Sequence, residues 1–528
     1  MTVISIDIRE ARRRIHSGRE IAFLDVREAG QFGEGHALFA IPCPYSVLEI
    51  RIGELVPRPS VPVILIDSGD GVAERAANRL TRLGYRDVMT AGGGMPAWAG
   101  AGFPVYKGVN VPSKTLGELA EAAWHPRMIT ADMLATWKAE GRDFAFFDAR
   151  PPEEYAKMRV PGAACLPNGE LAHRLPVTAV PTRPLVITCA GRTRGIIGAI
   201  GLRVAGHEGA VLALENGTQG WALAGQKLER GNRADPFPPL PPAGLAETRA
   251  RADALMARFD IEAIEPDRIR SMLADDTATT YVLDVRSAEE AAVDPISGAV
   301  HALSGQLVQA TDQWVGVRHA RLILLDDAGL RAALAAFWLK QLGFRPYVAR
   351  LDDAMRAALP EHEPGAKFPA SDFAQIPAVE AMAHAGIGGA VLVDIRPSLA
   401  YRKSHVEGAV WTVRPRVGRL VATLKGRSVL LIADDAAKAS LVAADMTEFG
   451  IGEVGIVKGG HEALVAAGAP TVSTPNDPTD ADAIDHLFFV HDRHDGNLEA
   501  SRRYLAWETG LVRQMDDMER AEFRLIAP

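Results

Sequence analysis

Apart from one occurrence at Asp7, near the N-terminus, the chain carries the tripeptide Asp-x-Arg in four copies at domain-sized intervals, and the spacing of these copies constrains its fold more than any other feature. The copies begin at Asp25, Asp148, Asp284 and Asp394, which are 123, 136 and 110 residues apart. Each copy ends a short apolar run of the kind that forms a buried strand. Since repeats of this length have the size of domains, and not of the short units of a solenoid, the sequence predicts tandem domains of one architecture.

The same landmarks follow each tripeptide in the same order. A Gly-Ala step comes next, as at Gly162-Ala163, and is followed by a second apolar strand, a loop, an alanine-rich helix and a third strand. The second strands are expected at residues 63–66, 185–188, 322–325 and 429–432. A glycine-rich turn before a short helix closes three copies, whereas the third copy lacks these glycines. Strands that alternate with helices predict an α/β fold with mainly parallel sheets.

These landmarks predict four domains and a tail. The domains are expected at residues 1–108, 126–232, 261–360 and 371–472, and the C-terminal helical tail at 473–528. The proline-rich stretch Pro236–Pro242 is expected to be a stiff linker that divides the chain into two halves.

The tail is expected to contain a docking helix. Its apolar residues recur at helical spacing, which predicts a helix that packs onto another domain or a second subunit, so a homodimer is one expected assembly. These residues are Tyr504, Leu505, Trp507, Leu511 and Met515. A second cluster in the tail is attributed to salt bridges or an interface and not to a metal, because its spacing does not match a metal site. Its members are His491, Asp492, His494 and Asp495.

The composition indicates the class of protein and its surroundings. A net charge of -8 argues against nucleic acid or an anionic membrane as a partner. The chain has no stretch resembling a transmembrane span, and its early charges do not suit a signal peptide. Its cysteines, Cys43, Cys165 and Cys189, are too few for a disulfide framework and favour a reducing, cytoplasmic location. Cys43 and Cys165 are interpreted as packed core residues.

Cys189 is the candidate nucleophile. It follows the apolar run at 185–188 and precedes a helix expected from Ile196. Unpaired N–H groups and the positive end of a helix favour an anion at such a turn, and two arginines add full positive charges. These effects are expected to lower the pKa of the thiol below about 8.5. The loop reads Cys189, Ala190, Gly191, Arg192, Thr193, Arg194 and Gly195.

Together, the Asp-x-Arg step, the Cys189 loop and the turn from Asn216 to Trp221 resemble the rhodanese (thiosulfate sulfurtransferase-like) family. The resemblance covers nearly the whole chain as four tandem modules, each implied to be a three-layer α/β/α domain. It implies that the loop cysteine becomes a persulfide. The aligned positions of the other copies hold Asp67, Asp326 and Ala433, so only the second module is expected to be catalytic.

The resemblance implies a sulfurtransferase that needs no cofactor and no metal. Cys189 would take sulfane sulfur from a small-molecule donor, thiosulfate or glutathione persulfide, and pass it to a thiol or cyanide. Backbone N–H groups from Ala190 to Gly195 would cradle the persulfide, and Arg192 and Arg194 would bind the oxyanion of the donor. Two alternatives stay open. One is a persulfide carrier or scaffold that does not turn over, and the other is a phosphatase or arsenate reductase.

The loop length favours sulfur over phosphorus. Arg194 lies five positions after Cys189, which gives Cys-x4-Arg, one residue shorter than the Cys-x5-Arg loop of protein phosphatases. Arg150, Asn216 and Trp221 are candidates for the wall of the pocket. Because the Asp-x-Arg pair and the glycine turn recur in copies without cysteine, a structural role is favoured for them. Glu153-Glu154 is interpreted as the solvated start of a helix.

Overall fold

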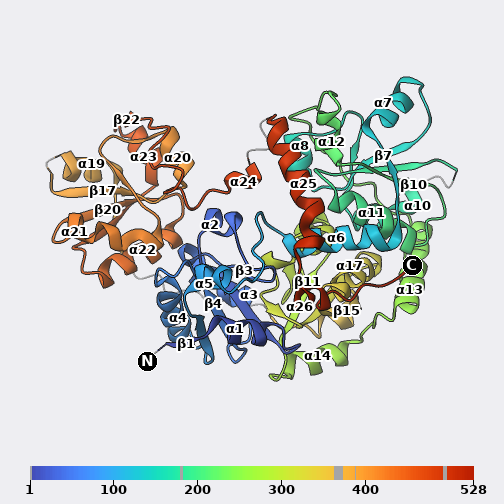
Figure 1. Cartoon of the computed structure of the whole chain (residues 1–528), viewed down its shortest axis with the longest axis horizontal. Coiled ribbons are helices and arrows are strands. Elements are labelled where there is room, and N and C mark those ends of the chain that lie inside the picture. The colour runs from blue at the N-terminus through green and yellow to red at the C-terminus, as the bar shows by residue number, and fades with distance from the viewer. Residues whose placement is uncertain (1–2, 179–181, 362–372, 387, 492–495) are drawn as a thin grey trace. The chain divides into compact units, whose positions relative to one another are not determined.

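The computed structural model describes residues 3–178, 182–361, 373–386, 388–491 and 496–528. Figure 1 shows the chain, which divides into two compact units. Unit 1 is formed by Met1–Ala11, Phe23–Val109 and Pro364–His491. Unit 2 is formed by Arg12–Ala22, Asn110–Glu363 and Asp492–Pro528.

The predicted division of the chain at the proline-rich stretch is therefore wrong. Pro236–Pro242 lies inside unit 2, and Pro242 is the first residue of helix α13 (Pro242–Phe259). Proline suits the first turn of a helix, where its missing N–H has no intrahelical partner to lose. The segment therefore leads into a helix of unit 2 and does not separate two halves.

Four mainly parallel sheets are present in the part of the chain that the structure describes, and we number their modules 1 to 4 along the chain. The predicted α/β fold with mainly parallel sheets is confirmed. In each sheet the strand that ends in Asp-x-Arg pairs with the strand before the loop on one side and with a short strand on the other. This common order brings every loop to the carboxyl end of its sheet.

Module 2 carries Cys189 and lies in unit 2. Its sheet has the order β6-β10-β9-β7-β8. The strands are β6 (Arg127–Ile129), β7 (Ala145–Asp148), β8 (Ala164–Cys165), β9 (Leu185–Thr188) and β10 (Val211–Leu214). Its helices are α7 (Ala131–Ala139), α8 (Pro152–Lys157), α9 (Glu170–His173), α10 (Leu175–Thr178), α11 (Thr193–Val204) and α12 (Gly217–Leu223).

Module 3 also lies in unit 2, with the sheet order β12-β11-β14-β15. The strands of this sheet are β11 (Thr280–Asp284), β12 (Val300–His301), β14 (Arg321–Asp326) and β15 (Arg345–Arg350). The short strand β13 (Val317–Arg318) instead pairs antiparallel with Ile21 and Ala22. Its helices are α14 (Pro266–Ala274), α15 (Ala288–Val293), α16 (Ser304–Gln309), α17 (Leu330–Gln341) and α18 (Asp353–Arg356). Three more helices of unit 2 are α6 (Val111–Trp124), α25 (Leu498–Gln514) and α26 (Asp517–Ala521).

Modules 1 and 4 make up most of unit 1. Module 1 contains β1 (Ile4–Ile6), α1 (Ile8–Ile15), β2 (Ile21–Asp25), α2 (Ala29–Glu34), β3 (Ile41–Pro42), α3 (Leu48–Leu55), β4 (Val63–Ile66), α4 (Val72–Arg82), β5 (Val88–Ala91) and α5 (Gly94–Gly100). Module 4 contains β16 (Gln375–Ile376), α19 (Ala378–Gly386), β17 (Ala390–Asp394), α20 (Ser398–Lys403), β18 (His405–Val406), β19 (Val410–Trp411), α21 (Val421–Leu424), β20 (Ser428–Ile432), α22 (Ala436–Glu448), β21 (Val454–Val457), α23 (Gly460–Ala466) and β22 (Thr471–Val472). Helix α24 (Phe488–His491) follows in the tail and packs on α2 within unit 1.

A buried ion pair recurs in all four modules and explains the Asp-x-Arg repeat. In module 2 the guanidinium group of Arg150 donates to both carboxylate oxygens of Asp148 over 2.9 and 2.7 Å. It also donates to the backbone carbonyl of Met158, eight residues further on. The arginines of the other modules bond their aspartates and the carbonyl eight residues on in the same way. The pair therefore ties the end of a strand to the end of the next helix.

A second buried network joins modules 1 and 4 inside unit 1. Arg414 is 1% exposed and donates to Glu49 from module 1 over 2.6 and 2.7 Å. It also donates to Asp445 on α22 over 3.0 and 3.2 Å. Arg79 on α4 bonds the same Asp445 over 2.6 Å. Charges this deeply buried persist only when they are paired and hydrogen-bonded, so these residues fix the contact between the two modules.

Candidate functional site

Cys189 lies directly after β9, and its loop leads into α11. The backbone N–H of Gly195 donates to Sγ of Cys189 over 3.3 Å. The thiol therefore lies inside the curve of the loop, beside the first turn of a helix whose N–H groups have no intrahelical partners. This confirms the predicted placement of the cysteine between a strand and a helix.

The start of α12 holds the loop in place. Gly217 has φ +54°, and a Cβ at this residue would lie 2.2 Å from the carbonyl oxygen of Cys189. The N–H of Thr218 donates to the same oxygen over 2.8 Å. Only glycine tolerates both the left-handed backbone and this close approach, so the turn requires glycine at position 217.

Modules 1 and 4 have the same turn but no cysteine. Gly94 and Gly460 have φ +59° and +56°. A Cβ at these glycines would lie 2.5 and 2.2 Å from the carbonyl oxygens of Asp67 and Ala433. Asp67 and Ala433 therefore occupy the position of Cys189, as the aligned strands predict.

Module 3 fills the equivalent position with an ion pair. Asp326 follows the apolar run of β14 and accepts a hydrogen bond from Nε of Arg331 over 2.9 Å. Arg331 lies five residues after Asp326, as Arg194 lies five residues after Cys189. A carboxylate therefore replaces the thiol, and the arginine neutralises it.

Three metal-ligating side chains of unit 2 come together beside this ion pair. Ligand atoms of His173, Glu290 and Asp327 lie within 4.8 Å of one another. Both carboxylates already pair with Arg331, and Glu290 also pairs with Arg174 over 3.1 Å. These ion pairs with Arg331 and Arg174 therefore explain why the two carboxylates of the cluster lie close together.

The Cys189 thiol is buried, and this overturns the predicted pKa. The residue is 2% exposed, and burial raises the pKa of the thiol above its ordinary value. Arg194 and the N–H of Gly195 act in the opposite direction, while the nearby carboxylate of Glu508 raises the pKa further. The prediction failed because a loop that looks open in sequence is covered by other elements, and desolvation of a thiolate is the largest effect.

Both arginines of the loop are paired with carboxylates. Nε of Arg192 donates to Glu118 on α6 over 2.7 Å, and its Nη2 also bonds Glu121. Arg194 bonds Glu154 on α8 through two donors over 2.6 and 2.7 Å. Both guanidinium groups therefore pair with carboxylates in this arrangement, and their binding of the oxyanion of a donor stays a prediction. Glu153 and Glu154 lie in the first turn of α8, and Glu153 is exposed, as expected, whereas Glu154 also binds the loop arginine.

Glu118, one of the carboxyl groups bonded to the loop arginines, has a raised pKa. Burial raises its pKa to about 7, although Arg192 opposes the shift. The neighbouring carboxylates of Glu508 and Glu121 raise it further. A group with this pKa changes charge near neutral pH, next to an arginine of the loop.

Helix α25 of the tail lies beside α6 and α12 within unit 2 (Figure 1). Helix α25 packs on α6 and on α12, which confirms the predicted docking of the tail onto another part of the chain. Glu508 on α25 is 2% exposed and accepts a hydrogen bond from Oγ1 of Thr193 over 2.7 Å. The tail thus contributes a buried carboxylate to the cysteine loop.

Of the predicted His/Asp cluster of the tail, Asp492, His494 and Asp495 lie outside the described residues.

The three residues predicted to line the pocket have other roles. Arg150 is engaged by its aspartate, as described above. Trp221 packs in the hydrophobic core of module 2, and its indole N–H donates to the carbonyl of Lys227 over 2.9 Å. Asn216 reaches the loop, because its Oδ1 accepts from Arg192 over 3.5 Å. Only Asn216 of these three therefore contacts a loop side chain.

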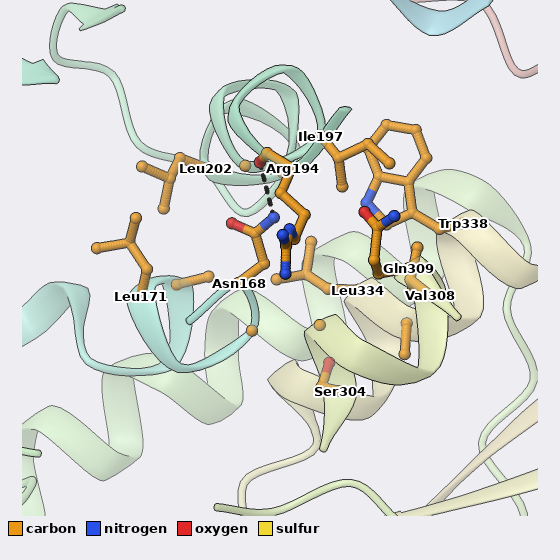
Figure 2. Close-up of a pocket in the computed structure, with 16 residues that line it drawn as sticks. Asn168, Leu171, Arg194, Ile197, Leu202, Ser304, Val308, Gln309, Leu334 and Trp338 are labelled. Atoms are coloured by element: carbon orange, nitrogen blue, oxygen red, sulfur yellow. Dashed lines mark hydrogen bonds between the residues drawn. The ribbon is translucent and has the colours of Figure 1, made fainter. Parts of the chain in front are cut away.

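Figure 2 shows a cavity lined by residues of α9, α11, α16 and α17. Asn168 and Arg194 lie next to each other there, and Nδ2 of Asn168 donates to the carbonyl of Arg194 over 2.8 Å. The rest of the wall is largely apolar and includes Ile197, Leu334 and Trp338. Asn168 supports the backbone of the loop, a role that no sequence motif indicates.

The remaining cysteines are buried and unpaired. All three cysteines are free, and burial raises the pKa of Cys43 and Cys165 to about 12. Their interpretation as packed core residues agrees with this environment. Among the described residues, the helices are too short or too polar to cross a lipid bilayer.

The chain is similar to proteins of known sequence and structure. A family model of the Rhodanese-like domain matches residues 7–101, 130–224 and 265–358. The crystal structure of a thiosulfate sulfurtransferase from Pseudomonas aeruginosa is 33% identical, covers 99% of this chain and 100% of its own, and superposes with a TM-score of 0.89. The uncharacterized protein YibN of Escherichia coli (strain K12) is 30% identical over 100 residues, which are 19% of this chain and 69% of that protein. Thiosulfate sulfurtransferase 18 of Arabidopsis thaliana is 28% identical over 123 residues, 21% of this chain and 89% of that protein.

Proposed function

Because this chain belongs to the rhodanese family, we propose that it is a sulfurtransferase whose reactive group is the thiol of Cys189. The observation that carries the proposal is the position of that thiol. Sγ of Cys189 lies 3.3 Å from the N–H of Gly195, inside a loop that begins a helix. The equivalent positions in the other modules hold Asp67, Asp326 and Ala433, which carry no sulfur.

In the first half-reaction the thiolate of Cys189 attacks the outer sulfur of a donor. With thiosulfate, a new S–S bond forms to Cys189, the bond between the two sulfur atoms of the donor breaks, and sulfite leaves with the electron pair. The loop N–H groups stabilise the negative sulfur of the persulfide. Arg194, five residues after Cys189, adds positive charge beside it.

In the second half-reaction an acceptor thiolate attacks the outer sulfur of the persulfide. The S–S bond at Cys189 breaks, the acceptor becomes a persulfide, and the Cys189 thiolate is restored. The cycle requires no cofactor and no metal.

We place the protein in the cytoplasm, since the unpaired state of the three cysteines suits a reducing compartment. A homodimer stays a prediction.

The proposed function is tested by steady-state turnover with thiosulfate or glutathione persulfide as donor and a thiol or cyanide as acceptor. We expect ping-pong kinetics that the variant Cys189→Ser abolishes, while Cys165→Ser keeps them as the matched control. A single round of transfer without turnover would support the alternative of a persulfide carrier. Hydrolysis of an aryl phosphate or reduction of arsenate, lost in Cys189→Ser, would support the phosphatase or arsenate reductase alternative.

A further inference from the structure

Two arginines lie side by side at the amino edge of the sheet of module 3. Arg321 and Arg345 are the first residues of β14 and β15, and they are register partners in this parallel pair. Adjacent strands are about 4.8 Å apart, so the two side chains leave the same face of the sheet as close neighbours. Two positive charges at this spacing repel each other, which favours an anion beside them. Asp326, which aligns with Cys189, is the last residue of β14 and lies at the opposite edge.

A cavity of about 220 Å³ lies at the amino edge, and polar side chains make up most of its wall. Helix α14 packs over the same face of the sheet, since Ile269 and Met272 belong to the hydrophobic cluster that contains Ile323 of β14. Three arginines from α14, β14 and β15 therefore meet around one space. The lining residues are Arg268, Ser271, Met272, Asp275, Arg321, Arg345 and Tyr347.

The carboxylates at the cavity do not balance its arginines. Asp275 accepts a hydrogen bond from Arg321, and Glu20 accepts one from Arg345 over 3.3 Å. The side chain of Arg268 forms no hydrogen bond or ion pair within the described part of the chain. Three arginines thus face two carboxylates, and one positive charge is left without a partner.

Two hydroxyl groups add uncharged donors. Ser271 lies three residues after Arg268 on α14, on the same face of the helix. Tyr347 lies two residues after Arg345 on β15, and residues two apart on a strand point to the same face. Neither hydroxyl bonds another of the described residues. Guanidinium and hydroxyl donors from one helix and two strands therefore line the same cavity.

We propose that this cavity binds a small tetrahedral oxyanion, either free phosphate or sulfate or the phosphoryl group of a small organic phosphate. Guanidinium groups bind the oxygens of such an anion through paired N–H donors, and hydroxyl groups donate to the remaining oxygens. A planar carboxylate has two oxygens and uses only part of a donor set that comes from three elements. The volume lies below the range of about 300–1,000 Å³ for drug-sized ligands, so it suits a small anion and not a nucleotide.

The site is separate from the proposed sulfur transfer and does not depend on it. The chain has a net charge of -8, so general electrostatic attraction does not bring an anion to it. Binding depends on the local surplus of positive charge at this cavity. The bound anion separates the charges of Arg321 and Arg345 and joins α14 to the edge of the sheet, so it stabilises module 3.

Calorimetric titration of the full-length protein with inorganic phosphate tests the site. The ionic strength is held constant with chloride, and phosphate has no sulfur to transfer to Cys189. Arg268→Gln removes the arginine that has no other partner, and we expect it to weaken binding about tenfold or more. Arg270→Gln is the matched control and should bind as the wild type does. Arg270 lies on the same helix, is 50% exposed in its side chain, pairs with Asp267 and does not line the cavity.

Titrations with sulfate and glycerol 3-phosphate identify the source of the oxyanion. Tighter binding of glycerol 3-phosphate than of phosphate would support an organic phosphate as the ligand. Equal binding of phosphate and sulfate, with weaker binding of the ester, would support a free oxyanion. Tyr347→Phe keeps the ring but removes the hydroxyl, and it should weaken binding of the preferred anion about tenfold.

Two results would overturn the inference. One is a wild type that binds none of the three anions beyond the chloride control. The other is a folded Arg268→Gln protein, checked by circular dichroism, that binds the anion as tightly as the wild type. Loading of sulfur on Cys189 should be the same in Arg268→Gln, Arg270→Gln and the wild type, so failure of this inference leaves the proposed function standing.

Discussion

At the scale of single residues, the acidity of Cys189 follows from opposing effects. The N–H of Gly195 and the charge of Arg194 favour the thiolate, while burial and Glu508 disfavour it. The position of the candidate nucleophile could be predicted from sequence, because a cysteine followed by arginines between a strand and a helix is a local pattern. Its acidity could not, because burial of the thiol has the largest effect on its pKa, and Glu508, which raises the pKa further, lies 315 residues after Thr193, which it contacts. No periodicity or motif marks such a distant carboxylate.

The pH dependence of Cys189 should reflect its burial. A thiol with a raised pKa is protonated at neutral pH, and its thiolate appears only as the pH rises above about 8.5. We expect the ultraviolet absorbance of the thiolate, taken as wild type minus Cys189→Ser, to rise above that pH. The rate of persulfide formation should rise in parallel. A difference spectrum that titrates near pH 6 or 7 would contradict this account.

The arginines of the Asp-x-Arg pairs should be structural wherever they occur. Arg150→Ala leaves Asp148 buried without its cation, which is expected to lower the free energy of unfolding by about 3–5 kcal/mol. Arg286→Ala in module 3 should cost a similar amount, although that module has no cysteine in its loop. Chemical denaturation of both variants measures this. A stable Arg150→Ala protein without activity would instead indicate a direct catalytic role.

At the scale of elements, the strand before the loop, the loop itself and the following helix form one structural unit that is repeated in each module. The repeat could be predicted because each copy carries its own turn residues and apolar strands. The carboxylates that surround the loop could not be predicted in this way. They come from α6, α8 and α25, which lie in different parts of the chain. The first turn of α8 illustrates the limit, since Glu154 looks solvated in sequence but pairs with Arg194.

The turn at Gly217 provides a matched pair of variants. Gly217→Ala should displace the loop, because its Cβ would lie 2.2 Å from the carbonyl oxygen of Cys189, and φ is +54°. We expect a loss of stability of about 1–3 kcal/mol and at least a tenfold loss of sulfur transfer. Gly94→Ala creates the equivalent clash in module 1 at 2.5 Å from Asp67. It should lower stability but preserve transfer by Cys189, and equal losses of transfer in both variants would contradict this assignment.

At the scale of the whole molecule, the modules do not group in chain order. Modules 1 and 4 form unit 1, and modules 2 and 3 form unit 2. The sequence suggests a different division because Pro236–Pro242 has the composition of a linker. Composition identifies a stiff segment, but the pairing of modules depends on buried contacts between residues that are hundreds of positions apart. Arg414 and Glu49, 365 positions apart, are an example.

The contact between modules 1 and 4 should depend on Arg414. Arg414→Ala leaves the buried carboxylates of Glu49 and Asp445 without this cation, with an expected loss of about 3–5 kcal/mol in unit 1. Hydrogen exchange should show faster exchange in α3 and α22 and unchanged protection in α11. Persulfide formation on Cys189 should be retained. Loss of protection in α11 would contradict the division into two units.

The central claim is that sulfur is carried on Cys189, and the most direct test is the mass of the intact protein. Wild type and Cys189→Ser are incubated with thiosulfate, and in parallel with glutathione persulfide, and weighed before and after reduction. The account predicts that the wild type gains one sulfur atom, that a thiol removes it, and that the variant gains none. The same gain in the variant, or no gain in the wild type with either donor, would contradict the account.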